Sequence, residues 1–219
     1  MRPSDALRAE HDADWAAIIH HPFTQALGNG SLPDAAMAMY LVQDYRFLDG
    51  FVRLMAQAIA HAPTVNDAVP AAQFLAVVTG PENTYFQRSL EALGHPDMGR
   101  DQPDAAPTTG FQALMAEAAA SGHYSHMLTV LVVAEWTYLG WASEQAPAKP
   151  DLPFYLSEWI KLHSGPEFEA VVAYLRDQLD HALEAAPEDE RAGAAALFAR
   201  AVQLERAFFD AVPGMAQQA

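Results

Sequence analysis

The sequence has 219 residues, 51% of them apolar, which is enough for one domain with a substantial core. Its formal net charge of -16, from 12 basic and 28 acidic residues, gives a surface that repels phosphate backbones and anionic lipids. Nucleic acid and membrane surfaces are therefore excluded as expected partners. The chain has no cysteine, which excludes disulfides, thiolate nucleophiles and sulfur-ligated metal centres.

The N-terminal sequence has charged residues throughout and no uninterrupted apolar segment, so we expect no secretory signal peptide. The longest apolar run, residues 127–141, is shorter than the roughly 20 residues of a membrane span. It also contains an acid, Glu135. These features predict a cytoplasmic protein.

Apolar residues recur at helical spacing along the chain, and alternating strand patterns are absent, so we predict an all-α bundle forming one domain over residues 1–219. The first long helix should cover 34–61, between Pro33 and Pro63. The next should cover 66–93, with a kink or break at Gly80-Pro81, where proline removes a backbone donor.

A proline-rich loop follows at 95–109, and it is too short to be a convincing domain linker. Turn residues then divide the rest of the chain into further amphipathic segments. These predict five more helices, at about 110–121, 124–144, 153–162, 166–185 and 188–212.

Asp44, Glu135 and Glu205 each occupy a position on an apolar stripe, on three different helices and within about one turn of an aromatic residue. Burying a carboxylate costs several kcal/mol unless it is paired, hydrogen-bonded or neutralised. One such acid is explained by a rotated helix or by a bond to a buried tyrosine or tryptophan. Three together predict a core that binds a flat, nitrogen-rich heterocycle, with at least one pKa raised toward neutrality for acid–base catalysis.

Several sequence blocks resemble the TenA/thiaminase II family in order and spacing, and they extend over most of the chain. They are His21-Pro22-Phe23, Gly30-Ser31-Leu32-Pro33, the block YLVQDYRFL at 40–48, Trp159-Ile160, the block EFEAVV at 167–172 and the block LERAFF at 204–209.

This resemblance implies a haem oxygenase-like helical bundle that forms homo-oligomers, dimers or tetramers, and that cleaves or salvages the pyrimidine half of thiamin. The substrate would be a small pyrimidine, with no cofactor and no metal. By the same resemblance, Asp44 would bind the amino group and ring nitrogen of the aminopyrimidine. Glu205 would act as acid or base at the leaving group, and Tyr138 would assist it by hydrogen bonding.

The remaining expected substrate contacts are Phe47, as part of a stacking wall, with Phe208, Phe111 and His163. Phe111 and His163 stand where many family members have tyrosines, so the group attached to the substrate ring is expected to differ.

The best-known members also have a nucleophilic cysteine on the helix that here contains Glu135, and this chain has none. A carboxylate is a weak nucleophile for addition to a pyrimidine ring. The pattern of Ala134, Glu135 and Tyr138 instead resembles the glutamate-type subgroup, associated with hydrolysis of amino- or formylamino-pyrimidines from thiamin breakdown. Glu135 would then be a general base on water or an acid on the departing amine.

Two alternatives stay open. The chain could be a non-catalytic pyrimidine-binding or regulatory protein that kept the pocket. A di-iron oxidase of the same fold is less favoured, because its Glu-x6-His pair is incomplete: Glu82 is followed seven residues later by Ser89.

Overall fold

The computed structural model describes residues 1–216, and within this part of the chain all regular secondary structure is helical. The prediction of an all-α fold is confirmed. The elements in chain order are α1 (Pro3–Glu10), α2 (Asp12–Ile19), α3 (Pro22–Asn29), α4 (Asp34–His61), α5 (Val65–Val77), the π-helical turn η1 (Val78–Glu82), α6 (Asn83–Ala92), α7 (Ala106–Ala120), α8 (Tyr124–Gln145), α9 (Phe154–Leu162), α10 (Pro166–Ala185) and α11 (Glu188–Asp210).

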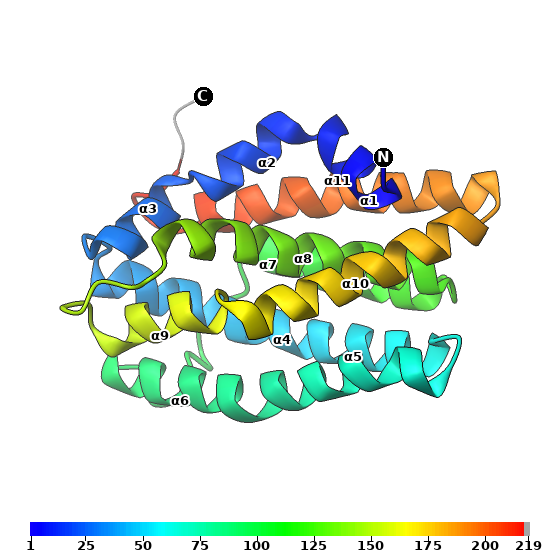
Figure 1. The fold of residues 1–219 in the computed structure, drawn as a ribbon. Helices are drawn as coiled ribbons and strands as arrows, with labels where there is room; N and C mark the ends of the chain where they lie inside the picture. Colours follow the sequence, from blue (N-terminus) through cyan, green and yellow to red (C-terminus); the bar gives the residue numbers. More distant parts are fainter. Residues whose placement is uncertain (217–219) are drawn as a thin grey trace.

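The long helices lie roughly side by side along one direction, and α8 runs through the middle of them (Figure 1). It contacts α4, α7, α10 and α11. A helix with neighbours on every side is apolar all round, and this explains the continuous apolar run that holds Glu135. The helices share one hydrophobic core, and no helix in residues 1–216 is both long and apolar enough to cross a membrane.

Helix α4 has the bounds that the sequence predicts. Pro33 is its N-cap, and Asp34 places a negative charge in the first turn, where the helix dipole favours it. The helix ends at His61 because Ala62 precedes a proline, which disfavours helical backbone at the residue before it. Helix α10 also matches its predicted bounds.

The predicted break at Gly80-Pro81 is confirmed, and it takes the form of the π-helical turn η1 between α5 and α6. Pro81 cannot donate a backbone hydrogen bond, so the α-helical ladder is interrupted there. The backbone N–H of Asn83 reaches back to the carbonyl of Val78, five residues earlier. Such π-bulges are rare and often occur at functional sites. This one brings Val78 and Glu82 to the interior.

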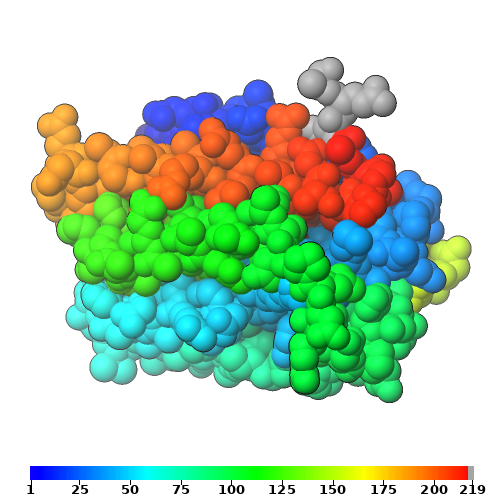
Figure 2. Space-filling model, turned by 180° about the vertical axis from the view of Figure 1, so that it is seen from behind, coloured from blue at the N-terminus to red at the C-terminus, as the bar shows by residue number. Residues whose placement is uncertain are grey.

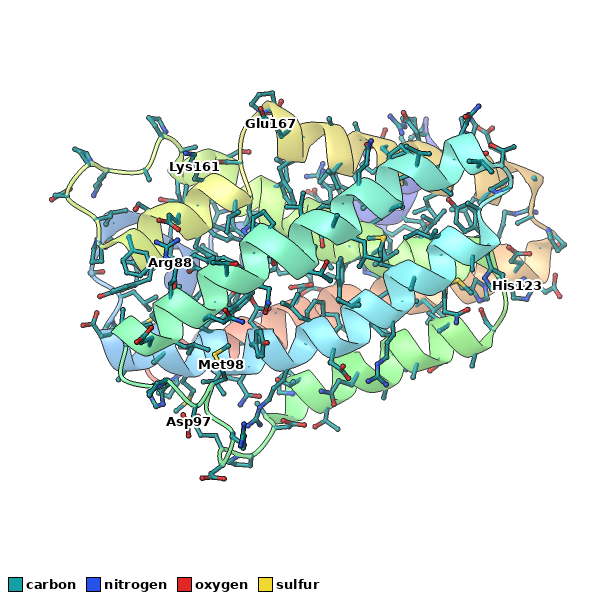
Figure 3. All side chains as sticks on the ribbon, turned by 90° about the horizontal axis from the view of Figure 1, so that it is seen from below. Arg88, Asp97, Met98, His123, Lys161 and Glu167 are labelled. Carbon is teal, nitrogen blue, oxygen red and sulfur yellow. The ribbon has the colours of Figure 1, made fainter. Side chains whose placement is uncertain are left out.

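The loop between α6 and α7, residues 93–105, is shorter than predicted because α7 begins at Ala106 with Pro107 in its first turn. It packs over the N-terminal half of α4 (Figure 2). Asp97 lies on the exposed side of the loop (Figure 3), whereas Met98 packs against the core. Arg46 Nη2 donates to the Gly99 carbonyl at 2.7 Å. Gly99 has φ of 64°, and a Cβ there would lie 2.6 Å from the Val42 methyl carbons, so glycine is required.

Candidate functional site

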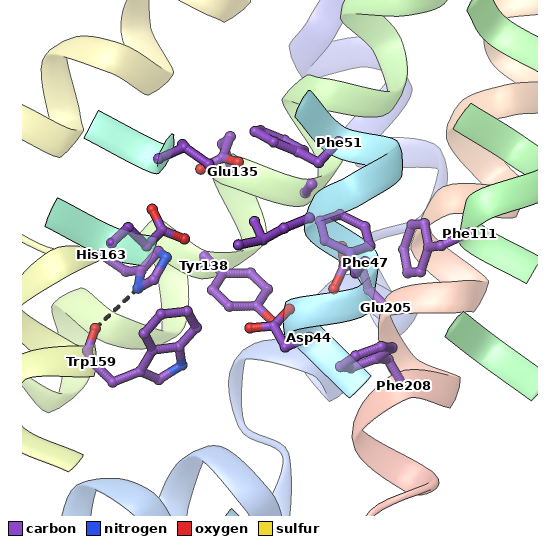
Figure 4. A pocket seen from close by; sticks show the side chains of 14 residues that line it. Asp44, Phe47, Phe51, Phe111, Glu135, Tyr138, Trp159, His163, Glu205 and Phe208 are labelled. Carbon is purple, nitrogen blue, oxygen red and sulfur yellow. Dashed lines mark hydrogen bonds between the residues drawn. The ribbon is translucent and has the colours of Figure 1, made fainter. Parts of the chain in front are cut away.

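A cavity inside the bundle collects all eight site residues that the sequence analysis selected (Figure 4). Six elements contribute to it, namely α4, η1, α7, α8, α11 and the region of α9. Its volume is about 30 Å³, which is more than a single water molecule needs. The lining residues are Asp44, Phe47, Leu48, Phe51, Val78, Glu82, Phe111, Ala134, Glu135, Tyr138, Trp159, His163, Glu205 and Phe208.

Four of the lining residues carry carboxyl groups, and all four are buried: Asp44 is 5% exposed, Glu82 7%, Glu135 8% and Glu205 2%. None of the fourteen lining residues, all within the described part of the chain, is lysine or arginine. The acids therefore face one another without a cationic partner at the cavity wall. Buried carboxyl groups in that situation hold their protons more tightly.

Asp44 enters the cavity from α4. Burial raises the pKa of its carboxyl group from 3.8 to about 7, and a hydrogen bond with Tyr40, one turn earlier, lowers that pKa in part. At neutral pH the group is therefore divided between its acid and carboxylate forms. A carboxyl group in this state can either accept a proton from a ligand nitrogen or donate one to it.

Glu135 and Glu205 enter from α8 and α11. Burial raises the pKa of Glu135 well above its usual value, and the negative charges of Glu82, Glu205 and Asp44 raise it further. The pKa of Glu205 is also raised, first by burial and then by the charge of Asp44. Strongly perturbed carboxyl pKa values of this kind are common at catalytic sites.

Glu82 is the lining acid that the sequence analysis did not select. In the sequence this residue lies next to a helix break, where α-helical periodicity cannot assign a face. It was weighed there only as a possible metal ligand. In the structure it ends the π-helical turn and faces the cavity. Burial raises the pKa of its carboxyl group to about 8, with a smaller effect from the charge of Asp44. The signal that could have found it is the Gly80-Pro81 break itself, since π-bulges often mark sites.

A short hydrogen-bond network holds Tyr138 in place. The hydroxyl groups of Tyr40 and Tyr138 are 2.7 Å apart, and the Trp159 indole Nε1–H donates to the Tyr40 hydroxyl at 3.2 Å. The network joins α4, α8 and α9. Neither Tyr40 nor Trp159 was predicted as a site residue, because the sequence pattern around each is typical of an aromatic residue in a hydrophobic core.

His163 follows α9 and contributes a neutral ring. Burial lowers its pKa to about 4, and the Trp159 carbonyl lies 3.0 Å from its Nδ1. A carbonyl oxygen can only accept, so Nδ1 carries the proton and Nε2 is left as a hydrogen-bond acceptor. The side chain thus offers the site one acceptor and no charge.

Phe47, Phe111 and Phe208 form an aromatic wall. The Phe47 and Phe111 rings meet edge to face at 5.2 Å, and Phe208 packs against them at 6.5 and 6.4 Å. Aromatic walls of this kind bind flat rings by stacking or by edge contacts. In residues 1–216, no group of three or more His, Asp or Glu side chains is arranged to hold a metal ion.

The protein is thus an all-helical bundle that surrounds a cavity lined by carboxyl groups and aromatic rings. The sequence matches the TENA/THI-4/PQQC family over residues 8–214. The chain belongs to this family, as its motifs predicted.

Curated relatives agree over most of the chain. Aminopyrimidine aminohydrolase of Halalkalibacterium halodurans is 26% identical over 200 residues, which cover 90% of this chain and 88% of that protein. Aminopyrimidine aminohydrolase of Helicobacter pylori is 24% identical, covering 96% of this chain and 98% of that one.

The fold is also that of solved TenA homologues. One from Pyrococcus furiosus superposes with a TM-score of 0.84 at 20% identity, covering 95% of this chain and 98% of the other. The haem oxygenase-like bundle predicted from the motifs is confirmed by this likeness.

Proposed function

We propose that this protein hydrolyses a C–N bond of a thiamin-derived aminopyrimidine, giving the hydroxymethylpyrimidine for thiamin salvage. The observation that carries the proposal is the convergence of buried carboxyl groups and aromatic rings on one cavity. The names of the relatives, aminopyrimidine aminohydrolases, support the same reaction class.

The cavity chemistry suits an aminopyrimidine ring. Asp44 would bind the exocyclic amino group and the adjacent ring nitrogen, because a carboxyl group with a pKa of about 7 can exchange a proton with that nitrogen. Phe47 and Phe208 would contact the ring faces or edges.

The reaction needs a base for water and an acid for the leaving nitrogen. Glu135 and Glu205 would share these proton transfers, because burial and the neighbouring acids raise the pKa of both carboxyl groups and so favour their proton-bearing forms. Tyr138 would hold the leaving group or the attacking water through its hydroxyl, which Tyr40 orients. Phe111 and His163 would contact the substituent of the ring, and the Nε2 atom of His163 would accept a hydrogen bond from it.

The test is turnover. Purified protein should release ammonia from the aminomethyl pyrimidine or formate from the formylamino compound, and Glu135→Gln should lower kcat by about 10²-fold or more. Glu144→Gln is the matched control, because Glu144 lies on the same helix with a side chain that is 43% exposed. If the wild-type protein binds the pyrimidine and turns over none of these compounds or thiamin, the chain is instead a non-catalytic binding protein.

We also propose that the chain forms one domain over residues 1–219 and works in the cytoplasm as a homo-oligomer, a dimer or tetramer. The shared core and the family match over 8–214 support the single domain; residues 217–219 lie outside the described part. The lack of cysteine is compatible with a reducing compartment. Exposed apolar side chains at Val65, Val69 and Val77 offer surface for self-association, which light scattering would measure.

A further inference from the structure

Glu82 is the one cavity acid without a role in the mechanism above. Its side chain is buried and faces the same space as Glu135. Within residues 1–216, no protein group donates a hydrogen bond to the carboxyl group of either residue. The oxygens of neither residue are among the fully enclosed polar atoms that lack a partner, so they are open to the cavity, where water or a ligand can meet them.

The surroundings of Glu82 contain acids and neutral groups. The titratable side chains that face the cavity or lie beside Glu82 come from every element that packs around it: Asp44 on α4, Tyr85 on α6, Glu135 and Tyr138 on α8, His163 after α9 and Glu205 on α11. After burial, the charge of Glu82 is the largest influence on the pKa of Glu135. On Glu82 itself, the neighbouring charge that raises the pKa is that of Asp44. Ionising Glu82 and Glu135 at once is disfavoured, because both carboxyl groups face one cavity whose lining has no lysine or arginine.

We propose that Glu82 and Glu135 act as a pair that carries a single shared proton through each turnover. This inference rests on the proposed hydrolysis and assigns to Glu82, in place of Glu205, the second of its two proton transfers. The pair resembles other carboxyl dyads in its physics, since two like charges in a dry site share one proton more readily than they lose both.

In the proposed reaction, the pair would donate one proton to the leaving nitrogen and accept one proton from water. The C–N bond breaks, and the nitrogen leaves with the electron pair and takes a proton from the carboxylic acid of the pair, departing as ammonia. Water forms the new C–O bond and gives one proton to the carboxylate of the pair. The two glutamates have then exchanged protonation states, and transfer of one proton between them restores the starting state. No other reactant is needed.

The position of Glu82 depends on the π-helical turn. Glu82 and Val78 both reach the cavity from this turn, whereas the exposed Val77 and Thr79 do not. Pro81 enforces the irregular backbone, because it can donate no hydrogen bond to the preceding turn. The break in the helix therefore places Glu82 in the wall of the cavity that Glu135 also lines.

The decisive variant is Glu82→Gln, which keeps the side-chain volume and removes the ionisation. We expect kcat to fall by about 10²-fold or more with a smaller change in KM, since proton transfer and not ring binding is lost. The pH profile of kcat should change from two limbs to one. Asp44 and Glu205 are intact in this variant, so they cannot account for the missing limb. Glu91→Gln, at an exposed position on α6, is the matched control and should keep both limbs.

The double variant Glu82→Gln, Glu135→Gln separates a pair from two independent acids. Residues that act as a unit are non-additive, so the double variant should be no slower than the slower single variant. Losses in kcat that multiply would overturn the pair. A Glu82→Gln protein with wild-type kcat and both limbs would overturn it as well.

Wild-type protein provides a check that does not depend on the folding of any variant. Its own kcat profile must have an acidic and a basic limb, and a flat profile would refute the shared proton. Failure of the underlying reaction looks different, because the wild-type protein would then bind the pyrimidine without releasing product at any pH. Thermal unfolding of each variant shows whether a lost rate reflects lost structure.

Discussion

Replacing Asp44 by asparagine should make the ligand-free protein more stable while removing its ability to process an aminopyrimidine. The carboxyl group is 5% exposed, has no cationic partner at the cavity wall, and must desolvate its charge whenever it ionises. Asparagine has nearly the same shape and can still take part in a hydrogen bond with Tyr40. It has no charge to bury, so the cost of ionisation disappears.

The size of the effect follows from the pKa. One pKa unit corresponds to about 1.4 kcal/mol, so a pKa raised from 3.8 to about 7 corresponds to about 4 kcal/mol of lost stability once the group is ionised in both states. The folded state binds the proton more tightly than the unfolded state does. Stability is therefore highest below pH 4 for this group and is lost as the pH rises from about 4 to about 7. The gain from Asp44→Asn should therefore grow between about pH 4 and pH 7 and be largest above pH 7.

Urea unfolding of the ligand-free wild type and of Asp44→Asn at pH 5 and pH 8 tests this reasoning. The stability advantage of the variant should grow by about 2 to 3 kcal/mol between the two pH values. Asp49→Asn is the control, because Asp49 lies on the same helix with a side chain that is 69% exposed, and its advantage should not change. An Asp44→Asn protein whose advantage is independent of pH would refute the burial argument, even if it were inactive.

Two further predictions concern the groups around Tyr138. Trp159→Phe keeps an aromatic ring but removes the N–H that donates to Tyr40 at 3.2 Å, and steady-state assays should find kcat/KM about 2- to 10-fold lower, the loss expected for one hydrogen bond. The His163 ring should titrate with a pKa of about 4 in an NMR pH series, because burial disfavours its cation. A midpoint near 6.5 would contradict that explanation and would make His163 a further source of pH dependence.

The sequence predicted the bounds of those helices that have proline at their ends and a regular helical spacing of apolar residues. Helices α4 and α10 were placed correctly because prolines bound them and their apolar faces are continuous. Helices α1, α2 and α3 were not predicted, since each has only eight residues and such short helices depend on tertiary packing more than on their own propensity. Trp15 on α2, for example, is 3% exposed because α8 and α11 cover that helix.

The sequence predicted the cavity residues that lie on regular α-helices and missed the acid on the π-helical turn. Asp44, Glu135 and Glu205 lie on regular helices, so their spacing along an apolar stripe was enough to turn them inward. Glu82 lies on the π-helical turn, where that spacing no longer applies. The hydrogen bond between Trp159 and Tyr40 joins residues 119 apart in the sequence, and no local pattern indicates such a contact.

The cavity lining, with four carboxyl groups and no lysine or arginine, also sets a limit on what the protein can process. A phosphate monoester would bring about two negative charges into a wall of acids that has no cation to receive them. Under the proposed function, pyrimidines that already carry a phosphate do not bind in the cavity. The substrates are restricted to unphosphorylated rings. Any kinase that traps the product as a phosphate ester must therefore act after this protein, and its product cannot re-enter the cavity.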